Sequence, residues 1–373
     1  MAKTLKDYFP MIQTRKEVLK EIGNKEKLWN IFELWKEEQQ EEFLDFCTGA
    51  RGVKMLYDSF FKEIFSPEYH PERVERILSL LLKRKVKIRQ ILQNDSVRIA
   101  EEQSLLITDM LVELEDGSLA NIEIQKLGYA FPGQRVACYS ADTLLRQYKR
   151  VKSERKKRFT YRDVKNVYTI VFFEKSTQEF QQLKDRYIHR SKQIFDTGLE
   201  LDTLQEYILI PLDIFRENMH NKIVENELDA WLSFLSFDEP ERIIQLMEAY
   251  PEFGAMYAEV YGICCNIERV MQMYSKELAE LDRNTVQYMI EEQEKLLKKK
   301  QEELAQMDEK LTQKDEQLTQ KDEQLTQKDE ELTQKDEELT QKDEELTQKD
   351  EQLTKKDEEI AELKRKLEEL LQK

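Results

Sequence analysis

Three polar side chains interrupt the apolar runs between Leu105 and Gln125. Asp109 lies in the first run, and Glu123 and Gln125 lie in the second. Both runs are rich in aliphatic and β-branched residues and flank a Glu-Asp-Gly turn, a pattern that predicts an antiparallel hairpin. Two carboxylates on neighbouring strands can bind one hard cation such as Mg²⁺, whose other positions go to water and a substrate phosphate.

The length of the turn decides whether Asp109 and Glu123 meet. A two-residue loop on Asp116 and Gly117 would set Asp109 opposite Ile124, with Glu123 on the far face of the hairpin. A three-residue loop that ends at a left-handed Gly117 sets Asp109 directly opposite Glu123. We favour the three-residue loop because it also builds an apolar back face. Its register pairs Leu114 with Ser118, Met110 with Ile122, and Val112 with Ala120.

The hairpin and its surroundings resemble the PD-(D/E)xK nuclease core, in the variant in which glutamine replaces the motif lysine. The motif residues here are Asp109, followed after the turn by Glu123-Ile124-Gln125. A longer ordered set of segments is similar to the PD-(D/E)xK nuclease family transposases, which are related to the recombination-promoting nucleases. These segments, within about residues 50–215, are LYDSFFKEIF (56–65), IEIQKLGYAFPGQRVACYSADTLLRQYKR (122–150) and VYTIVFF (167–173).

This resemblance implies an α/β (α+β) restriction-endonuclease-like core, with a mixed sheet flanked by helices, and a metal-dependent DNA endonuclease activity. Asp109 and Glu123, with the backbone carbonyl of Ile124, would hold Mg²⁺ or Mn²⁺ for in-line attack of a bound water. Gln125 would orient that water by hydrogen bonding, but it lacks the positive charge of a lysine.

A possible source of that charge is Lys62, on the first core helix predicted at residues 53–65. Lys62 and Asp58 are four residues apart and share one face of this helix. The resemblance favours an approach of either side chain to the metal site, and the alternative is a surface ion pair. The opposite, buried face is predicted to hold Leu56, Phe60, Phe61, Ile64 and Phe65.

A helix predicted at residues 134–150 follows the hairpin, and the strongly basic run KRVKSERKKR follows at residues 149–158. The helix is expected to pack on the sheet through Ala137, Ala141, Leu144, Leu145 and Tyr148. Tyr139 either belongs to the core or lies on the side that could meet a phosphate. Contacts with the DNA backbone supply affinity without reading sequence, although a charge run can also be a solvated face. The candidate DNA-binding residues are Arg135, Arg146, Lys149, Arg150, Lys152 and Arg155.

Other segments are predicted to complete the sheet. The basic stretch at residues 83–89 and the apolar runs at 167–173 and 207–210 are expected to form strands. A polar stretch between the last two is predicted to be helical. The chain is expected to divide into an N-terminal helical segment (1–50), the nuclease-like core (51–215), a helical subdomain (216–276) and a heptad-repeat coiled coil (277–373).

The distribution of charge and the composition limit the classes of protein to which this sequence can belong. The formal net charge is −17, but residues 301–373 contain 25 acidic and 13 basic residues and so carry −12 of it. The remaining −5 is compatible with DNA binding. No apolar run is long enough for a membrane span, and no signal peptide is visible, so a cytoplasmic protein is expected. The four cysteines form no C-x-x-C pair and the three histidines are far apart, which argues against a zinc centre.

The C-terminal segment is built on a repeat of seven residues, LTQKDE(E/Q). An apolar residue recurs every seventh position from Leu297 to Leu367, whereas the second core row holds lysines in the middle and apolar residues only near the ends. Polar core rows weaken a coiled coil, so we predict a weak zipper with stronger ends that joins copies of the chain. The alternative is a lone solvated helix supported by pairs such as Glu331–Lys335, Glu338–Lys342 and Glu345–Lys349.

Two functions follow from these observations. The first is a Mg²⁺-dependent DNA endonuclease, associated with transposition or recombination, with an oligomerising tail. The second is a non-catalytic DNA-binding or scaffold protein that keeps the nuclease fold, and the glutamine at Gln125 motivates it. A measurement of divalent-metal binding would distinguish the endonuclease from the non-catalytic protein.

Overall fold

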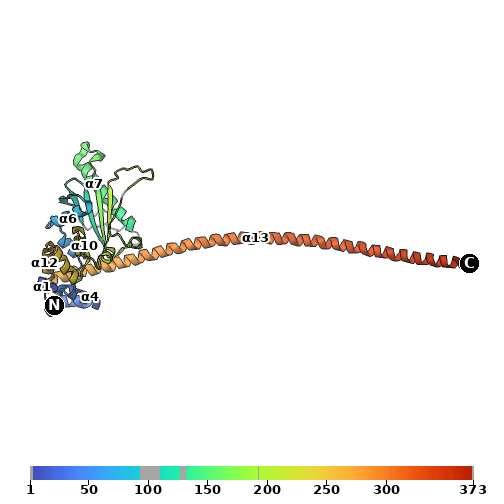
Figure 1. The fold of residues 1–373 in the computed structure, drawn as a ribbon, viewed down its shortest axis with the longest axis horizontal. Coiled ribbons are helices and arrows are strands. Elements are labelled where there is room, and N and C mark those ends of the chain that lie inside the picture. The colour runs from blue at the N-terminus through green and yellow to red at the C-terminus, as the bar shows by residue number, and fades with distance from the viewer. Residues whose placement is uncertain (1–2, 93–109, 127–131, 192, 372–373) are drawn as a thin grey trace. The chain divides into compact units, whose positions relative to one another are not determined.

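The computed structural model describes residues 3–92, 110–126, 132–191 and 193–371. The chain forms two compact units, Met1–Glu294 and Lys295–Lys373. The first unit contains a β-sheet with helices around it, and the second is the continuation of the last helix (Figure 1). None of the helices in the described residues is long and apolar enough to cross a membrane.

A mixed six-stranded sheet lies at the centre of the first unit, in the order β1-β2-β3-β4-β6-β5. The strands β1, β2 and β3 are antiparallel, whereas β3, β4 and β6 run parallel, and β5 is an antiparallel edge strand. The predicted mixed sheet with flanking helices is therefore confirmed. The strands are β1 (Ile88–Ile91), β2 (Met110–Leu114), β3 (Leu119–Gln125), β4 (Val167–Phe173), β5 (His189–Arg190) and β6 (Gln205–Pro211).

The β2–β3 hairpin has the register that the three-residue loop predicts. Met110 pairs with Ile122, and Val112 pairs with Ala120. The Leu114 amide donates to the Ser118 carbonyl at 2.9 Å, and Gly117 has a φ of 84°, in the left-handed region that glycine adopts without steric cost. Asp109 lies outside the described residues, so its position opposite Glu123 stays a prediction.

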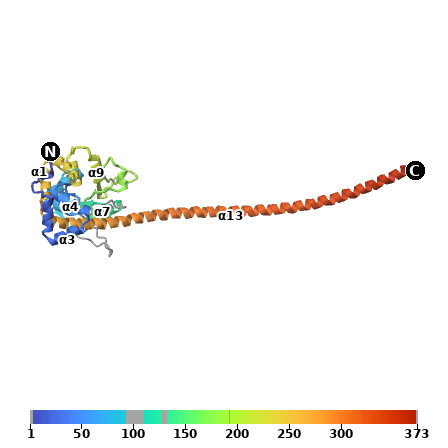
Figure 2. The same cartoon turned by 90° about the horizontal axis from the view of Figure 1, so that it is seen from below.

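One face of the sheet packs against most of the helices of the first unit. Its side chains, among them Ile122, Ile170 and Ile210, share a continuous apolar core with these helices. The N-terminal helices belong to the same core and lie beside the first turns of the last helix (Figure 2). There the ring of Tyr274 contacts the rings of Trp35 and Phe43. The helices are α1 (Leu5–Tyr8), α2 (Arg15–Gly23), α3 (Glu26–Leu34), α4 (Glu37–Thr48), α5 (Asp58–Ile64), α6 (Pro71–Leu82), α9 (Leu212–Met219), α10 (Glu227–Ser236), α11 (Pro240–Ala249), α12 (Glu252–Cys264) and α13 (Ile267–Leu371).

Three predicted elements differ from the structure. The helix predicted from residue 53 begins only at Asp58, although its five predicted apolar positions are all buried. The basic segment predicted as a strand at 83–89 first closes α6, where Lys83 has a φ of 53°, and pairing in β1 starts at Ile88. The polar stretch before β6 forms only the short α8 (Gln178–Gln181) and β5, since it has too few apolar residues to bury a helix.

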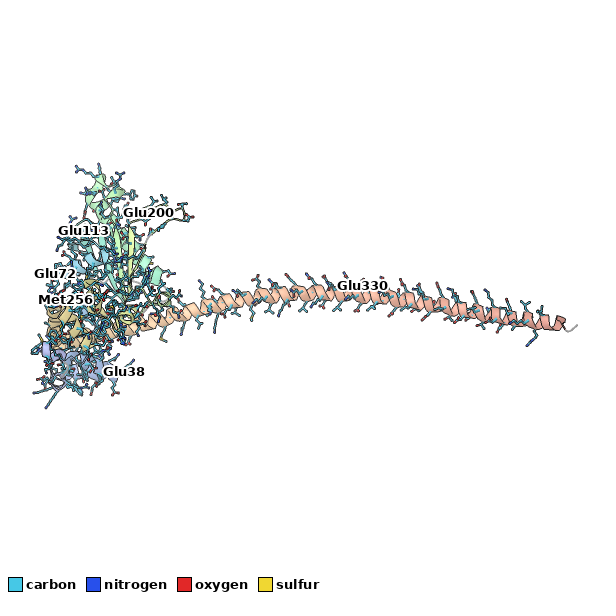
Figure 3. All side chains as sticks on the ribbon, in the orientation of Figure 1. Glu38, Glu72, Glu113, Glu200, Met256 and Glu330 are labelled. Atoms are coloured by element: carbon cyan, nitrogen blue, oxygen red, sulfur yellow. The ribbon has the colours of Figure 1, made fainter. Side chains whose placement is uncertain are left out.

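The second unit is helical from Lys295 to Leu371. The leucines that recur every seven residues are exposed to solvent, by 54–61% from Leu297 to Leu353. Around Glu330, the side chains of the helix point away from its axis (Figure 3). The predicted pairs Glu331–Lys335, Glu338–Lys342 and Glu345–Lys349 do not form in this structure, and the ion pair of the described tail is Glu362–Lys366. Each repeat threonine instead donates to the carbonyl four residues earlier, as Thr326 does to Asp322 at 2.9 Å. The coiled coil stays a prediction.

Candidate active site

The polar residues of β3 form a buried face beneath one long helix, α7 (Pro132–Arg155). Asn121, Glu123 and Gln125 alternate along β3 and are each at most 3% exposed. Thr169 of β4 pairs with Asn121 and extends the polar face across the neighbouring strand. The opposite face of the same strand carries Ala120 and Ile122 into the apolar core.

The face of α7 that meets the sheet is also largely polar. Its buried side chains recur at helical spacing, at Val136, Tyr139, Ser140, Thr143 and Gln147. Of the predicted packing face, Leu144 does contact the sheet, at Leu119 and Val167, but Ala137 and Ala141 are exposed and Leu145 is 52% exposed. The helix covers the polar face of β3 and, through Val136, the apolar side chains Val171 and Phe173 of β4. Tyr139 therefore belongs to the buried side of α7.

Two anchors fix α7 on the sheet. The Gln147 side chain donates to the Gly117 carbonyl at 2.9 Å and accepts from the Lys165 amide at 2.9 Å. It thus ties the helix to the β2–β3 turn and to the segment before β4. Near the middle of the helix, Gln205 of β6 donates to Ser140 Oγ at 3.0 Å. The position of α7 over β3 is set by side-chain amides and hydroxyls.

Glu123 and Gln125 differ in how their polar atoms are satisfied. Asn121 Nδ2 donates to Glu123 Oε1 at 2.9 Å, which holds the carboxylate against its own strand. Within the described part of the chain, neither Oε1 nor Nε2 of Gln125 has a hydrogen-bond partner, and Asn121 Oδ1 and Thr169 Oγ1 are also unpartnered. A buried amide without partners costs about 1–3 kcal/mol, so this face retains unused hydrogen-bonding capacity.

A second carboxylate on the hairpin, Glu113, has a structural role. It is 3% exposed and forms ion pairs with Arg150 of α7 and Arg89 of β1, and Gln90 donates to it at 2.5 Å. Burial alone would raise the pKa of Glu113, but the hydrogen bond and charge of Arg150, with Gln90 and Arg89, hold it below its usual value. Arg150, a predicted DNA contact, therefore joins α7 to the hairpin.

The other predicted DNA-binding residues lie along α7. Arg135, in the first turn of α7, donates to Tyr139 Oη at 2.9 Å, and Arg146, past the middle of the helix, pairs with Asp142 at 2.7 Å. Three more lie towards its end, where Lys149 is exposed, Lys152 donates to Tyr148 Oη at 2.9 Å, and Arg155 is 3.8 Å from Asp163. These residues are therefore spread along the helix, with most of them at its C-terminal end.

Lys62 of α5 forms the ion pair with Asp58 that the spacing allowed, at 2.7 Å, and its side chain is 42% exposed. An approach of Lys62 to the predicted metal site stays a prediction, since that site includes Asp109. Sequence reasoning overlooked a neighbouring lysine, Lys126, which directly follows the motif. Lys126 is 7% exposed and pairs with the equally buried Glu277 of α13. The other oxygen of Glu277 accepts from the Asp58 amide at 2.9 Å, so this pair joins the end of β3 to α5 and α13.

The donor set at the polar face of β3 fits a hard divalent cation. Glu123 supplies a carboxylate, and Gln125 and Asn121 supply unpartnered amide oxygens, which are the ligand types that Mg²⁺ and Mn²⁺ accept. Among the described residues, no three His, Cys, Asp or Glu side chains gather into a metal site. A complete carboxylate set would therefore need Asp109.

Comparison with known proteins supports the resemblance seen in the sequence. The sequence model of the PD-(D/E)XK nuclease family transposases matches residues 55–288. The match includes the sheet, α7, the helices after β6 and the first turns of α13. No curated protein and no solved structure gives a significant match.

Proposed function

Because the chain belongs to the PD-(D/E)XK nuclease family transposases, we propose that it is a Mg²⁺-dependent DNA endonuclease whose active site lies on the polar face of β3. One observation carries this proposal. A buried carboxylate, Glu123, lies one step along the strand face from Gln125, whose buried amide has no hydrogen-bond partner among the residues that the structure describes. A face that served only for packing would not leave such an amide unsatisfied.

In the proposed site, Asp109 and Glu123 hold the metal ion, with Mn²⁺ as an alternative to Mg²⁺. The bound ion supplies charge stabilisation at the scissile phosphate and lowers the pKa of a water. Asn121 keeps the Glu123 carboxylate in place through its 2.9 Å hydrogen bond. The Gln125 side chain accepts a hydrogen bond from the attacking water or donates one to a phosphate oxygen, and Lys62 or Arg135 supplies the positive charge that Gln125 lacks.

The tail fits an oligomerisation segment. Its apolar residues recur every seven positions and form an open row along the helix, and such a row is buried when two or more helices associate. We therefore propose that copies of the chain associate through the tail, which would bring two or more DNA-binding units to one substrate.

Nicking of supercoiled plasmid DNA tests the proposed activity. The wild-type chain should nick the plasmid with Mg²⁺ or Mn²⁺ and lose activity in EDTA. Asp109→Ala and Glu123→Gln should each abolish nicking. The matched control is Glu115→Gln, which removes an exposed carboxylate from the turn of the same hairpin and should leave the rate unchanged. Full activity of Asp109→Ala would refute the proposed site.

The glutamine at Gln125 favours a second candidate, a DNA-binding protein without catalysis. The two candidates differ in metal binding, measured as the shift in melting temperature on adding Mn²⁺. A nuclease should be stabilised by the metal, and Asp109→Ala with Glu123→Gln should remove the shift. DNA binding with neither a metal-dependent shift nor nicking would select the non-catalytic protein.

A further inference from the structure

We propose that the C-terminal end of α7 and the turns after it bind unpaired DNA bases by stacking. This region, the α7 tip, comprises residues 148–165 and contains two short 3₁₀ turns, η1 (Lys156–Arg158) and η2 (Tyr161–Asp163). It projects from the sheet at the green end of α7 in Figure 1. The proposal rests on the proposed nuclease function and adds to it the kind of DNA that the enzyme recognises.

Three aromatic rings form a small cluster at the α7 tip. Tyr148 and Tyr161 lie nearly parallel, with ring centroids 6.2 Å apart and an angle of 13° between the ring planes. Phe159 packs edge-on against both, with centroids 5.5 Å from Tyr148 and 5.6 Å from Tyr161. The Tyr161 side chain is the outermost of the three and is 78% exposed. An aromatic face is therefore available to a flat ligand.

The turn that carries Tyr161 is held in place. Thr160 donates through its amide and hydroxyl to Asp163 at 2.7 and 3.0 Å, closing the η2 turn. Val164 is buried, and the Lys165 amide donates to Gln147 of α7. The exposed ring thus stands on a structured support, which lowers the conformational entropy lost when a ligand stacks on it.

The surroundings of the cluster are strongly basic. Residues 149–165 contain nine lysines and arginines but only two acids, Glu154 and Asp163. Asp163 is engaged in the η2 turn, and Lys152 Nζ lies 5.2 Å from the Tyr148 ring centroid. Aromatic faces set among basic side chains are the combination that binds single-stranded nucleic acid, because bases stack while the cations meet the phosphates. Paired bases inside a duplex offer no free face for such stacking.

The position of the α7 tip defines where on the DNA the unpaired bases would lie. The predicted phosphate contact Arg135 and the platform residue Tyr148 are thirteen residues apart on α7, which corresponds to roughly 20 Å along the helix. With about 3.4 Å per base step, the stacked base would lie on the order of six nucleotides from the cleaved phosphate. The substrate class that fits is DNA with an unpaired segment next to a duplex.

Fluorescence anisotropy of the full chain in EDTA tests the proposal without cleavage. The probes are a labelled 30-nucleotide single strand and the same strand in a duplex, each titrated over a range of salt concentrations. The wild type should bind the single strand more tightly. Tyr161→Ala should weaken single-strand binding about tenfold and leave both duplex binding and the salt dependence unchanged, whereas Tyr161→Phe should bind like the wild type.

Two control variants separate stacking from charge and from general surface effects. Tyr69→Ala removes another tyrosine, which is 73% exposed and lies outside the α7 tip. This variant should change neither the affinity for the single strand nor the affinity for the duplex. Lys157→Gln with Arg158→Gln should weaken binding to both probes and reduce the slope of log affinity against log salt by about 0.7 per charge on the single strand. Melting temperatures verify that each variant is folded.

Equal binding of both probes by the wild type, or an unchanged single-strand affinity in folded Tyr161→Ala, would overturn the proposal. The active site is tested separately, since Glu123→Gln should lose nicking but retain single-strand binding. If Glu123→Gln is inactive while Tyr161→Ala binds normally, the stacking platform is wrong and the nuclease stands. If Tyr161→Ala weakens binding but the wild type never nicks, the platform stands and the proposed activity fails.

Discussion

Gln125 combines a cost in stability with a proposed role in catalysis. The residue is 3% exposed, and neither polar atom of its amide has a hydrogen-bond partner in the described parts of the chain. Gln125→Leu keeps a similar volume and removes the unsatisfied atoms, so it should raise the free energy of unfolding by about 1 kcal/mol. The same variant should lower the rate of plasmid nicking by at least tenfold. Urea unfolding and the nicking assay measure the two effects.

A control for the stability effect is Thr169→Val, because Thr169 Oγ1 on the same face is likewise unpartnered. The Thr169→Val variant should also have a higher free energy of unfolding than the wild type. A Gln125→Leu variant that is stabilised and fully active would show that the amide has no part in the reaction.

Glu113 gives the hairpin a pH-dependent stability. Its pKa in the folded protein is lowered, since Arg150, Gln90 and Arg89 outweigh the opposing effect of burial. A lowered pKa contributes stability above the unfolded value of about 4.3, and this stability is lost as the pH falls through the folded pKa. Arg150→Met should therefore cost about 3 kcal/mol near neutral pH, and the difference from the wild type should shrink below about pH 4.

Urea unfolding of both proteins between pH 3 and pH 8 measures this difference. Arg146→Met, which removes another arginine of α7 with its own carboxylate partner, provides a comparison outside the Glu113 cluster. A constant difference between Arg150→Met and the wild type across the pH range would contradict the role assigned to Glu113.

Among the elements, the β2–β3 hairpin was predictable in detail and α7 was not. The turn at Gly117 and the alternation along β3 are local features, and they correctly gave the register from Met110 to Leu119. The face of α7 was mispredicted at Ala137, Ala141 and Leu145, because these apolar residues were assumed to be buried. The spacing of Tyr139, Thr143 and Gln147 was visible in the sequence, but the backbone groups of Gly117 and Lys165 that bond Gln147 are brought to α7 only by the fold.

The pairing of Lys126 with Glu277 was not predictable, because the two residues are 151 positions apart in the sequence. This buried pair joins β3, α5 and α13, so loss of one partner leaves an unpaired charge in the interior. Glu277→Ala should cost about 3–5 kcal/mol of unfolding free energy. The double variant Lys126→Met with Glu277→Gln should recover most of this loss, because the new amide oxygen can still accept from the Asp58 amide.

Thermal and urea unfolding of Lys126→Met, of Glu277→Gln and of the double variant form a thermodynamic cycle. The exposed pair Lys25–Glu268, which also joins the N-terminal helices to α13, is a suitable comparison and should cost less than about 1 kcal/mol when broken. Additive effects of the Lys126 and Glu277 substitutions would mean that the two side chains do not interact.

For the whole molecule, the seven-residue period of the tail leads to a prediction about length. Deletion of residues 325–331 removes one complete repeat and keeps the leucine row in phase, whereas deletion of residues 325–326 turns the later leucines by about half a turn, away from both core rows. If the tails associate, the dissociation constant of the first variant should stay within about threefold of the wild type. The second should dissociate more readily, because the leucines before and after the deletion no longer share one seam.

Sedimentation equilibrium of the full chain and both deletion variants measures this difference, and a chain ending at Glu294 provides the monomer reference. A lone helix has no seam, so the wild type and both deletion variants would then all sediment with the mass of their own monomer. A monomeric wild type at concentrations on the order of 100 μM would rule out association through the tail. An unequal response of the two variants would instead require a partner helix, because the phase of a leucine row matters only when another helix packs against it.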